Sequence, residues 1–459
     1  MSCCRVIQRV IFFAGVLLAV IGCHTSRENL ATFNRHYETG RMDSAASFAA
    51  QKISRRDRPR GDDLLWMLQL GAAERFRQQY DESTFWLDLA EGTLRHYALN
   101  RNEIADSIAA AVINDTVTPY TGTIYDGIMV NTYKALNFMR QGQEALARVE
   151  FNRAMDRQRR AKEEFAEQIQ AVRERLEKNQ YSRLARRSIE NADLRTKLEQ
   201  TYSSLDEFEA YQDFVNPFST YLAGVFFAAT NDYPKASDLL RQSAGMLPDN
   251  PYVLRDFAEV EQALNTGSTL KPTVWVFFEN GLGPVKEEVR LDLPLFIATN
   301  KVRYFGVALP QLVYRPAAAA KLDMWADGTL YTTEIAADMD RLVQTEFKKE
   351  FDGILLRTVL SAIAKAAAQY VLEENNAEAA AIVMAVFHYA TTAADVRIWS
   401  ALPKNFQVAR FARPADGWID ISLGALPAQR VQLPDCTHTM VYVKMVSTAS
   451  RPIIELIPF

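Results

Sequence analysis

The stretch NTGSTLKPTVWVFFE, residues 265–279, separates two parts of the sequence that have different hydrophobic periods. Its first residues are small and polar and include a glycine, which is typical of a break between elements. From Thr273 onward it is β-branched and aromatic, as expected for a buried strand. Apolar residues recur every three or four positions upstream and every second position downstream. The sequence therefore predicts a multidomain protein with a helical domain at 23–264 and an α+β domain at 265–459.

The α+β domain is predicted to contain a mixed or antiparallel sheet with helices on one side. A turn at 280–284 follows the first strand, and the next run alternates apolar with charged residues from Glu288 to Leu293, so we expect these two runs to form a hairpin. Further strands are expected at 302–308, 313–315, 406–411, 418–423 and 440–446. Amphipathic or apolar stretches predict helices at 335–347, 354–371 and 378–389.

Small and large residues recur at fixed offsets in the helical domain. One copy comprises Gly224, Phe227, Tyr233, Ala236, Leu240, Ser243 and Pro248; the others comprise Ala135, Phe138, Gly142, Ala147, Phe151 and Ala154, and Leu70, Gly71, Tyr80, Ser83, Leu87 and Ala90. This pattern resembles the tetratricopeptide repeat (TPR), in which small residues let two helices approach. The copies do not follow the tight period of about 34 residues. We therefore expect degenerate TPR-like helix hairpins separated by inserted helices, with a generic helical bundle as the alternative.

An insert at about 143–205 is predicted to form a long projecting helical hairpin. Apolar residues from Phe151 to Leu176 advance by three or four without a proline, which indicates one long helix. The stretch from Leu184 to Leu205 could return along this helix as a coiled coil.

The same insert contains a candidate partner-binding patch of basic residues. It comprises Arg157, Arg159, Arg160, Lys162, Arg186 and Arg187. Clustered cations of this kind attract anionic partners. The alternative is a solvated helix face whose charges pair with neighbouring acids.

The N-terminus has the features of a secretory signal. Arg5 and Arg9 precede an apolar run, Ile11–Ile21, that is shorter than the roughly 20 residues of a spanning helix. The run ends Val20-Ile21-Gly22-Cys23, which resembles the lipobox of bacterial lipoproteins. The resemblance implies a signal peptide at 1–22 and lipidation of Cys23 with fatty acids such as palmitate; an uncleaved anchor is the alternative. His24, rather than Asp, favours the outer membrane, with the protein facing the periplasm.

Composition argues against several classes of function. The net charge of −4 gives no basic footprint for nucleic acid. Cleavage and lipidation would leave Cys436 as the only free cysteine, which excludes an intrachain disulfide and a zinc–cysteine cluster. We expect no catalytic residues, no metal and no cofactor. Two weaker candidates are Cys436 with His438 as a dyad, and the carboxylates of Glu334, Asp338 and Asp340, which we expect at a helix N-terminus as dipole-complementing acids.

Several phrases together resemble an uncharacterised family of bacterial lipoproteins with TPR-like helices. They are Trp275–Pro284, Ala337–Asp340, Arg397–Pro403, Lys134–Asn137 and Ala147–Ala154. The resemblance implies only a loose association with envelope lipoproteins that activate peptidoglycan synthases.

From these features we expect a non-enzymatic, lipid-anchored scaffold or adaptor that binds envelope proteins through its TPR-like helices, in cell-wall assembly or export. The alternative is an enzyme or small-ligand-binding protein that acts through a pocket in the C-terminal domain. Such a pocket would first be sought around Asp338, His388, Arg397 and Lys404.

Overall fold

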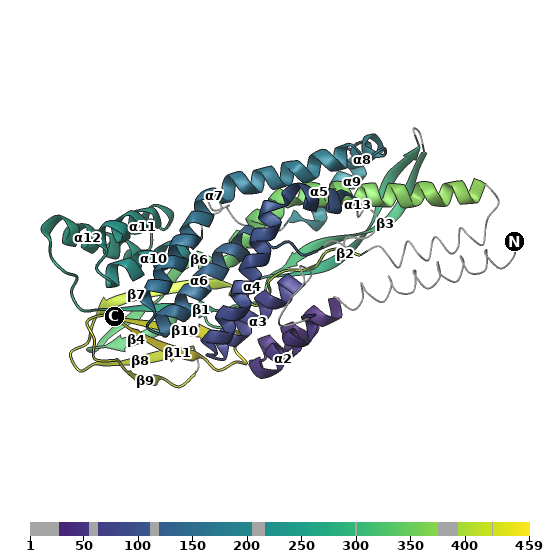
Figure 1. Ribbon diagram of the computed structural model, residues 1–459. Helices are drawn as coiled ribbons and strands as arrows, with labels where there is room; N and C mark the ends of the chain where they lie inside the picture. Colours follow the sequence, from purple (N-terminus) through teal and green to yellow (C-terminus); the bar gives the residue numbers. More distant parts are fainter. Residues whose placement is uncertain are drawn as a thin grey trace.

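The structure is a computed structural model, and it describes residues 27–54, 63–110, 119–203, 216–298, 301–374, 393–424 and 426–459. The N-terminal part is helical, and the C-terminal region contains mixed and antiparallel sheets, as predicted (Figure 1). Among the described residues, no helix combines the length and the apolar composition that crossing a bilayer requires.

Residues 27–38 are helical, and the labelled helices follow them. They are α2 (Met42–Lys52), α3 (Leu64–Phe76), α4 (Tyr80–Leu99), α5 (Arg101–Ala110), α6 (Ile124–Arg140), α7 (Glu144–Glu177), α8 (Ser182–Ile189), α9 (Ala192–Thr201), α10 (Pro217–Ala229), α11 (Tyr233–Met246), α12 (Pro251–Thr266) and α13 (Met339–Glu374). The strands are β1 (Thr273–Asn280), β2 (Val285–Ala298), β3 (Lys301–Val313), β4 (Leu322–Ala326), β5 (Thr329–Thr332), β6 (Glu334–Asp338), β7 (Asn405–Ala412), β8 (Trp418–Leu423), β9 (Gln429–Gln432), β10 (Thr439–Met445) and β11 (Ile453–Pro458).

Four helix hairpins share one type of connection. The helix at 27–38 leads into α2, α3 into α4, α6 into α7, and α10 into α11 through short turns. The middle residue of each turn has a left-handed backbone: Gly40 (φ 71°), Gln78 (60°), Gly142 (70°) and Asn231 (62°). The same left-handed turn therefore connects the two helices of each hairpin. Only two of the four residues are glycines, for which this conformation carries no steric penalty.

The recurring small and large residues meet across these hairpins. A Cβ added to Gly71 would lie 2.7 Å from the side chain of Leu87, and one added to Gly224 would lie 2.9 Å from that of Leu240. Ser83 also donates a hydrogen bond to the Gly71 carbonyl at 2.8 Å. Only a residue without a side chain lets the two helices approach this closely.

The hairpins pack in sequence order, each against the next. Helix α2 packs on α3, α4 on α6, α7 on α10, and α11 on α12. Two helices begin with an asparagine cap that is followed by a proline. The Asn216 side chain accepts hydrogen bonds from the amides of Phe218 and Ser219 at the start of α10. The Asn250 side chain accepts from the second and third amides after it in the same way at the start of α12. A side-chain oxygen here satisfies amides that have no partner within the helix.

The main sheet has the strand order β11-β10-β1-β7-β6. Strand β1 pairs in parallel with β10 and antiparallel with β7. Its side chains are buried on both faces: Trp275 and Phe277 point to the helices, whereas Val276 and Phe278 point to a second sheet, of order β5-β4-β8-β9. This burial explains the continuous apolar run that opens the domain.

The predicted hairpin between β1 and the following strand is wrong. Among the described residues, strand β2 pairs only with β3, in a separate long two-stranded ribbon. The expected strand at 313–315 does not form, because β3 ends at Val313 and the next two residues lie beyond it. The turn at Gly281–Pro284 sends the chain away from the main sheet instead of folding it back. The two edges of β1 pair with β7 and β10, which come much later in the chain.

The helices expected at 335–347 and 354–371 are one helix, α13, which begins only at Met339. Glu334 to Asp338 form an edge strand, β6, so Glu334 does not lie at the helix N-terminus where we expected it. Gly353 does not interrupt the helix, because one glycine in a helix interior costs only about 1 kcal/mol. The third helix, expected at 378–389, lies outside the described residues.

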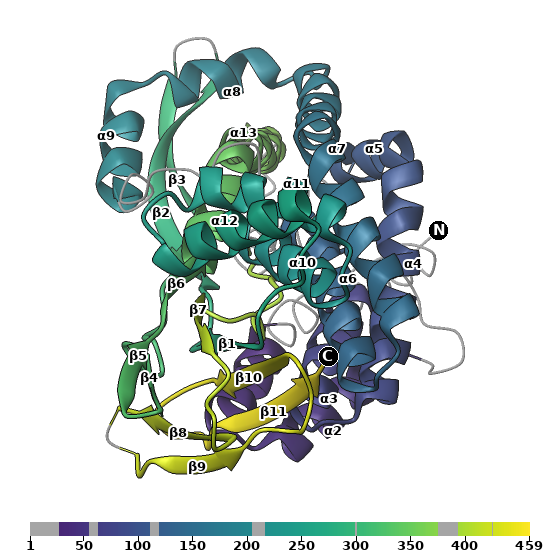
Figure 2. The same cartoon turned by 90° about the vertical axis from the view of Figure 1, so that its left-hand side faces the viewer.

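The long helix of the insert is confirmed as α7, but the coiled coil is wrong. Helices α8 and α9 do not return along α7; α8 packs on α13 and β2, and α9 packs on β2. Arg187 lies over the Phe296 ring at 4.2 Å, and Lys197 over the Tyr304 ring at 5.3 Å. Helices α8 and α9 therefore lie against the β2–β3 ribbon (Figures 1 and 2).

One hydrophobic core runs across residue 265. It joins helix residues such as Phe33, Leu68 and Phe218 to Trp275 and Phe406 of the main sheet. A second core lies between the main sheet and the four-stranded sheet. The molecule is thus layered as helices, mixed sheet and antiparallel sheet, and the ribbon and α13 extend from one end (Figures 1 and 2).

Candidate functional site

The face of the helical array that turns inward is covered by the chain's own sheet. Phe218 of α10 stacks on Phe406 of β7 with ring centroids 3.6 Å apart. Gln69 of α3 donates to Ser400 at 2.8 Å and accepts from the Ala401 amide at 3.1 Å. All five of these residues are buried. No open groove for a partner therefore lies between these helices and these segments.

A buried ionic cluster joins α6 to the main sheet. The Glu279 carboxylate on β1 accepts hydrogen bonds from Tyr133 of α6 at 2.8 Å and from Tyr442 of β10 at 2.7 Å, and it pairs with Lys444 at 2.6 Å. Burial alone would raise the pKa of Glu279, but the charges of Lys444 and Arg75 and the hydrogen bonds from Lys444 and Tyr442 together lower it. The charges are mutually compensated, so this cluster joins the two parts and offers no reactive group.

Two further pairs connect the helices with the sheet. Arg75 of α3 pairs with Glu455 of β11 at 3.3 Å, and Arg410 of β7 pairs with Asp256 of α12 at 2.9 Å. Desolvation acts against the charge of Arg75, but Glu455 reverses the effect and the pKa is raised. Removing one member of such a pair leaves the other charge buried and unpaired, which costs about 3–5 kcal/mol.

A cavity with charged walls lies where α13, α7, the ribbon and the loop before α6 meet. Its volume is about 160 Å³. Its charged walls are Lys286 from β2, Glu350 and Arg357 from α13, and Asp395 and Arg397 from the segment before β7. Its apolar walls are Pro119, Ile169, Val172, Pro310 and Ile354. Convergent polar groups in an apolar hollow are the usual mark of a ligand site.

The charges of this cavity are unevenly paired. Two nitrogens of the Arg397 guanidinium donate hydrogen bonds to the Asp395 carboxylate, at 2.8 Å and 2.7 Å. The Lys286 ammonium lies over the Phe347 ring at 5.5 Å, and its charge acts on the carboxylates of both Glu350 and Asp395. Burial raises the pKa of Glu350. Glu350 is therefore the carboxylate of this wall that most readily loses its charge.

Beside the cavity, the N-terminus of α6 is held by a capping box. Thr123 accepts from the Asp126 amide at 3.2 Å, and Asp126 accepts from the Thr123 amide at 2.9 Å. Asp126 also accepts from Tyr120 at 2.6 Å, yet it is fully buried and its other oxygen has no partner. Burial raises its pKa to about 6. The Ile124 amide donates to Glu346 of α13 at 2.9 Å, and burial raises the pKa of Glu346 well above its ordinary value.

A second cavity, of about 100 Å³, adjoins the first. The two share walls at Thr121, Gly122, Thr123, Gln168 and Val172. Beyond this rim the second cavity is lined chiefly by apolar side chains, among them Leu94, Ile104 and Phe165, with Arg157 and Glu164 at one side. The two hollows therefore continue one another between the helical array and α13.

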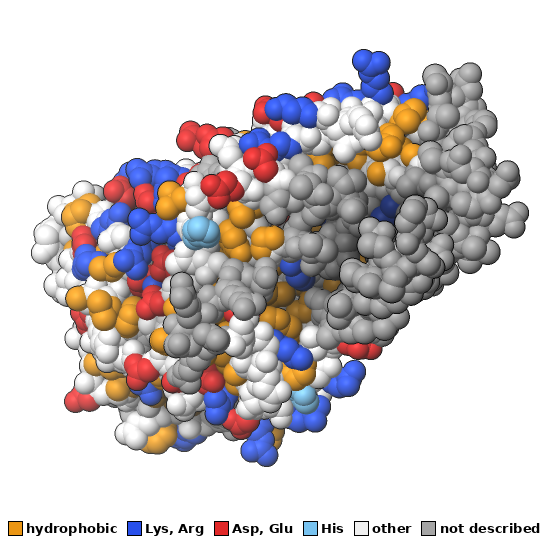
Figure 3. Space-filling model, turned by 45° about the vertical axis from the view of Figure 1, so that its right-hand side comes forward, with side chains coloured by type: hydrophobic (Ala, Val, Ile, Leu, Met, Phe, Trp, Pro, Cys, Tyr) orange, Lys and Arg blue, Asp and Glu red, His pale blue; other side chains and the backbone are white. Residues whose placement is uncertain are grey.

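The predicted basic residues do not lie together. Arg157 turns inward to Asn131 at 2.7 Å and Glu91 at 3.1 Å, whereas Arg159 and Arg160 are exposed and pair with Asp156 at 2.5 Å and 3.0 Å. These pairs match the alternative of a salt-bridged helix face, and Figure 3 shows positive and negative side chains interspersed on this side of the molecule.

The remaining members of the predicted patch lie elsewhere. Arg186 pairs with Glu177 at 2.6 Å, at the far end of α7, and Arg187 covers Phe296. Position 162 belongs to α7, but the structure does not describe its Lys162 side chain.

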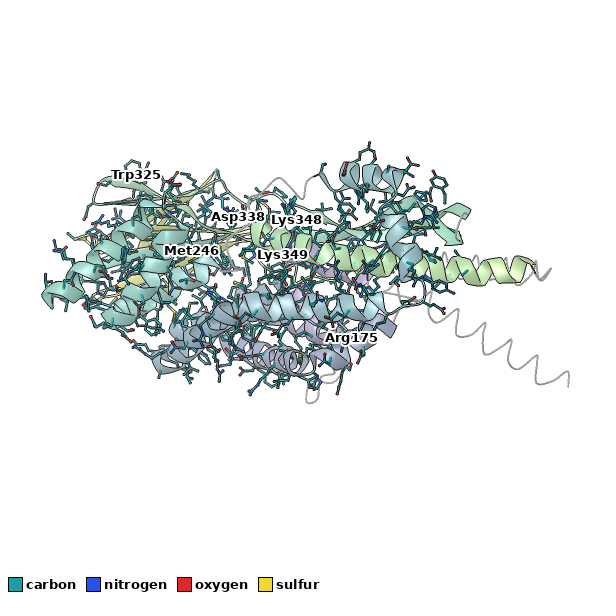
Figure 4. The ribbon with its side chains drawn as sticks, turned by 90° about the horizontal axis from the view of Figure 1, so that it is seen from above. Arg175, Met246, Trp325, Asp338, Lys348 and Lys349 are labelled. Carbon is teal, nitrogen blue, oxygen red and sulfur yellow. The ribbon has the colours of Figure 1, made fainter. Side chains whose placement is uncertain are left out.

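The other predicted residues have mainly structural roles. Asp338 caps α13 by accepting from the amides of Asp340 and Arg341 at 2.9 Å and 3.3 Å, and Lys404 pairs with Asp340. Figure 4 shows Asp338 where β6 meets α13, far from Arg175 on α7. Cys23 and His388 lie outside the described residues.

The cysteine–histidine dyad does not form. The Cys436 thiol lies 3.0 Å from the backbone oxygen of His438, and the imidazole packs against Trp275 with ring centroids 5.3 Å apart. Burial lowers the pKa of His438. Asp338, Arg397 and Lys404 are the described members of the set that we expected around a pocket, and of these three only Arg397 lines the charged cavity. Sequence reasoning missed Lys286 and Glu350, because an alternating strand and an amphipathic helix are expected to carry such charges.

Comparison with known proteins adds no family. A scan against models of protein families finds no match, and a search of curated proteins finds none either.

Proposed function

We propose that this protein is a non-enzymatic, lipid-anchored adaptor of the cell envelope, built on TPR-like helix hairpins that bind partner proteins. The observation that carries the proposal is the equivalence of the hairpins. Each has a left-handed backbone at the middle residue of its turn, and in two of them a glycine, Gly71 or Gly224, makes the same close contact with a leucine of the second helix. Stacked units of this kind present extended surfaces, and protein binding is their common use.

We expect the partner to bind the outer helices. Because the inner face packs on the sheet, the second helix of each hairpin provides the accessible surface. Phe85 of α4 and Leu146 and Val149 of α7 are each at least 40% exposed there, among charged side chains. An outward surface of aromatic and aliphatic side chains with a charged surround suits a folded protein partner.

The proposed anchor restricts how the molecule meets its membrane. Only Thr25, His24 and Ser26 separate Cys23 from Arg27, which pairs with Glu288 near the start of the β2–β3 ribbon at 3.9 Å. Four residues span at most about 14 Å. Lipidation at Cys23 would therefore hold this side of the molecule close to the bilayer, with the helical array beside it.

Two experiments test the proposal. Metabolic labelling with an alkyne palmitate should mark the wild-type chain and leave Cys23→Ala unmarked; an unlabelled wild type would refute the anchor. A photo-crosslinking amino acid at Phe85 or Val149 should give a discrete adduct with an envelope protein in intact cells, whereas the same probe at Leu330 of β5, which is also exposed, should not. Equal adducts at all three positions, or none, would refute a partner on the outer helices.

The alternative, a small-ligand-binding protein, is favoured by a separate observation: the charged cavity beside α13. The helical array and the C-terminal region form this cavity together, so it does not belong to the C-terminal domain alone.

A further inference from the structure

We propose that the junction between α13 and the N-terminus of α6 is a pH-sensitive latch, which is closed while its carboxyl groups carry protons and opens as they ionise. The latch consists of Asp126 in the first turn of α6 and of Glu346 and Glu350 on α13. The two cavities described above adjoin it, so its opening would admit water or solutes to them. This inference goes beyond the adaptor proposal and does not depend on it.

The fold places the three carboxyl groups close together. Glu346 and Glu350 are four residues apart, so they lie on one face of α13. Glu346 accepts a hydrogen bond from the Ile124 amide at 2.9 Å, and Ile124 lies two positions before Asp126. Asp126 and Glu346 are buried, and Glu350 is partly buried in the cavity wall. Like charges four residues apart repel each other even on an exposed helix, and poor solvation strengthens the repulsion.

The cations that face the latch do not balance three ionised carboxylates. The Lys286 ammonium of β2 favours the charged form of all three, so it is shared among them. Arg357 of α13 favours the charged form of Glu350. Arg397 is held by two hydrogen bonds to Asp395, a fourth carboxylate that also acts on Glu350. Ionisation of the whole latch would therefore leave negative charge without enough compensation in a poorly solvated place.

The other titratable neighbours do not change this balance. Tyr120 donates to Asp126 at 2.6 Å, and burial raises the pKa of both Tyr120 and Tyr125 well above the usual value, so both stay neutral. Across the shared rim, α7 contributes Arg157 and Glu164, which pair with Glu91 at 3.1 Å and with Arg160 at 2.9 Å. One oxygen of Asp126 has no hydrogen-bond partner among the described residues, a state that costs much less for a protonated carboxyl than for a carboxylate.

The direction of the pH response follows from these contacts. Burial raises the pKa of Asp126 to about 6, that of Glu346 well above its ordinary value, and that of Glu350 as well. Solvent in an open junction would return these groups toward ordinary values of about 4. Protonation therefore favours the closed form fully below about pH 4, and this advantage is lost as the pH rises through the raised values. Each carboxyl that ionises on opening changes the opening equilibrium by up to about tenfold per pH unit.

Hydrogen exchange with mass spectrometry tests the latch on the full chain in lipid nanodiscs between pH 5 and 8, after correction for the intrinsic pH dependence of exchange. Protection of residues 119–130 and 340–356 should fall at least about tenfold more than that of β10 over this range. An equal pH dependence of protection in these segments and in β10 would overturn the proposal.

Variants separate the latch from a merely structural contact. Glu346→Gln keeps an oxygen for the Ile124 amide but cannot ionise, so the pH-dependent fall should shrink at least about threefold. Glu350→Gln should act likewise, and it keeps the test decisive if Glu346→Gln fails to fold. The matched control is Asp352→Asn, an exposed carboxyl on the same helix, which should follow the wild type. An unaltered fall in both folded glutamine variants would refute the assignment.

Lys286→Met should have the opposite effect on the pH dependence. Without the ammonium, the pKa of each latch carboxyl in the closed form rises further, so protection should continue to fall at higher pH and end at least about threefold lower at pH 8 than in the wild type, relative to pH 5. A loss of protection that is the same at every pH would show that Lys286 only packs there, and it would contradict the latch. None of these results depends on lipidation or on partner crosslinks.

Discussion

Removing the Tyr133 hydroxyl tests whether the helices and the sheet unfold as one unit. Tyr133→Phe deletes the 2.8 Å hydrogen bond from α6 to the Glu279 carboxylate and leaves the ring in place against Trp399, at a centroid distance of 5.9 Å. A hydrogen bond to a charged group contributes about 1.5–3 kcal/mol. Glu279 keeps Tyr442 and Lys444 as partners, so we expect a loss of about 2 kcal/mol, near the lower end of that range.

The matched control is Tyr442→Phe, which removes the 2.7 Å hydrogen bond to the same carboxylate from within the sheet. Native-state hydrogen exchange with mass spectrometry separates the two parts. If one core unites them, both variants should speed the slowest amides of α6 and of β10 alike, by about 30-fold for a loss of about 2 kcal/mol. Faster exchange in α6 alone for Tyr133→Phe, with β10 unchanged, would refute the reasoning and show two independent folding units.

Three further predictions concern packing and charge. Gly71→Ala places a methyl group against Leu87 and should lower the melting temperature through overpacking of about 1–3 kcal/mol, whereas Gly92→Ala, which meets nothing within 4 Å, should leave it equal or raise it. Phe218→Ala should cost about 3–5 kcal/mol in urea denaturation, and a loss below about 1 kcal/mol would contradict the packing described. Burial raises the pKa of Asp126 in the folded state to about 6, from 3.8. Protonation of Asp126 therefore stabilises the folded state fully below about pH 4, and this stabilisation is lost as the pH rises through 6. Asp126→Asn should therefore flatten the melting temperature between pH 4 and 6 relative to wild type; an unchanged slope would count against a buried, protonated Asp126.

The sequence predicts local elements better than their partners. Trp418–Leu423 is the predicted strand, and α7 is the predicted long helix, because alternation and helical spacing are properties of neighbouring residues. The pairing of β1 with β10 and β7 depends on residues more than a hundred positions away. Nothing in the turn after Asn280 distinguishes a tight hairpin from a departure into a separate ribbon.

Short edge strands escaped prediction for a different reason. Strands β5 and β9 span four residues each, too few for a period to show, and β6 merges in sequence with the amphipathic start of α13. The caps at Asn216 and Asn250 could be located from the Asn-Pro dipeptides, which are strong helix-start signals. An amphipathic pattern shows which residues of a helix are buried but not which element buries them. For this reason we expected the stretch that forms α8 and α9 to pack on α7, whereas these helices pack on the ribbon.

The candidate site was the least predictable feature. Lys286, Glu350 and Asp395 come from a strand, a helix and an irregular segment, and their meeting requires the three-dimensional arrangement. The basic residues of α7 form a conspicuous cluster in the sequence, but helical geometry turns Arg157 inward and pairs its neighbours with Asp156.

The pairing of Arg75 with Glu455 has a consequence for how the protein is made. A ribosome completes α3 long before it reaches β11, and at about 5–20 residues per second this interval lasts roughly 20–80 seconds. Throughout it, the side of the nascent helices that will meet the sheet is uncovered and Arg75 lacks its counter-charge. Loss of the final strands by truncation would make that transient condition permanent, so intact synthesis to the last residues decides whether this chain stays soluble or is taken up by chaperones and proteases.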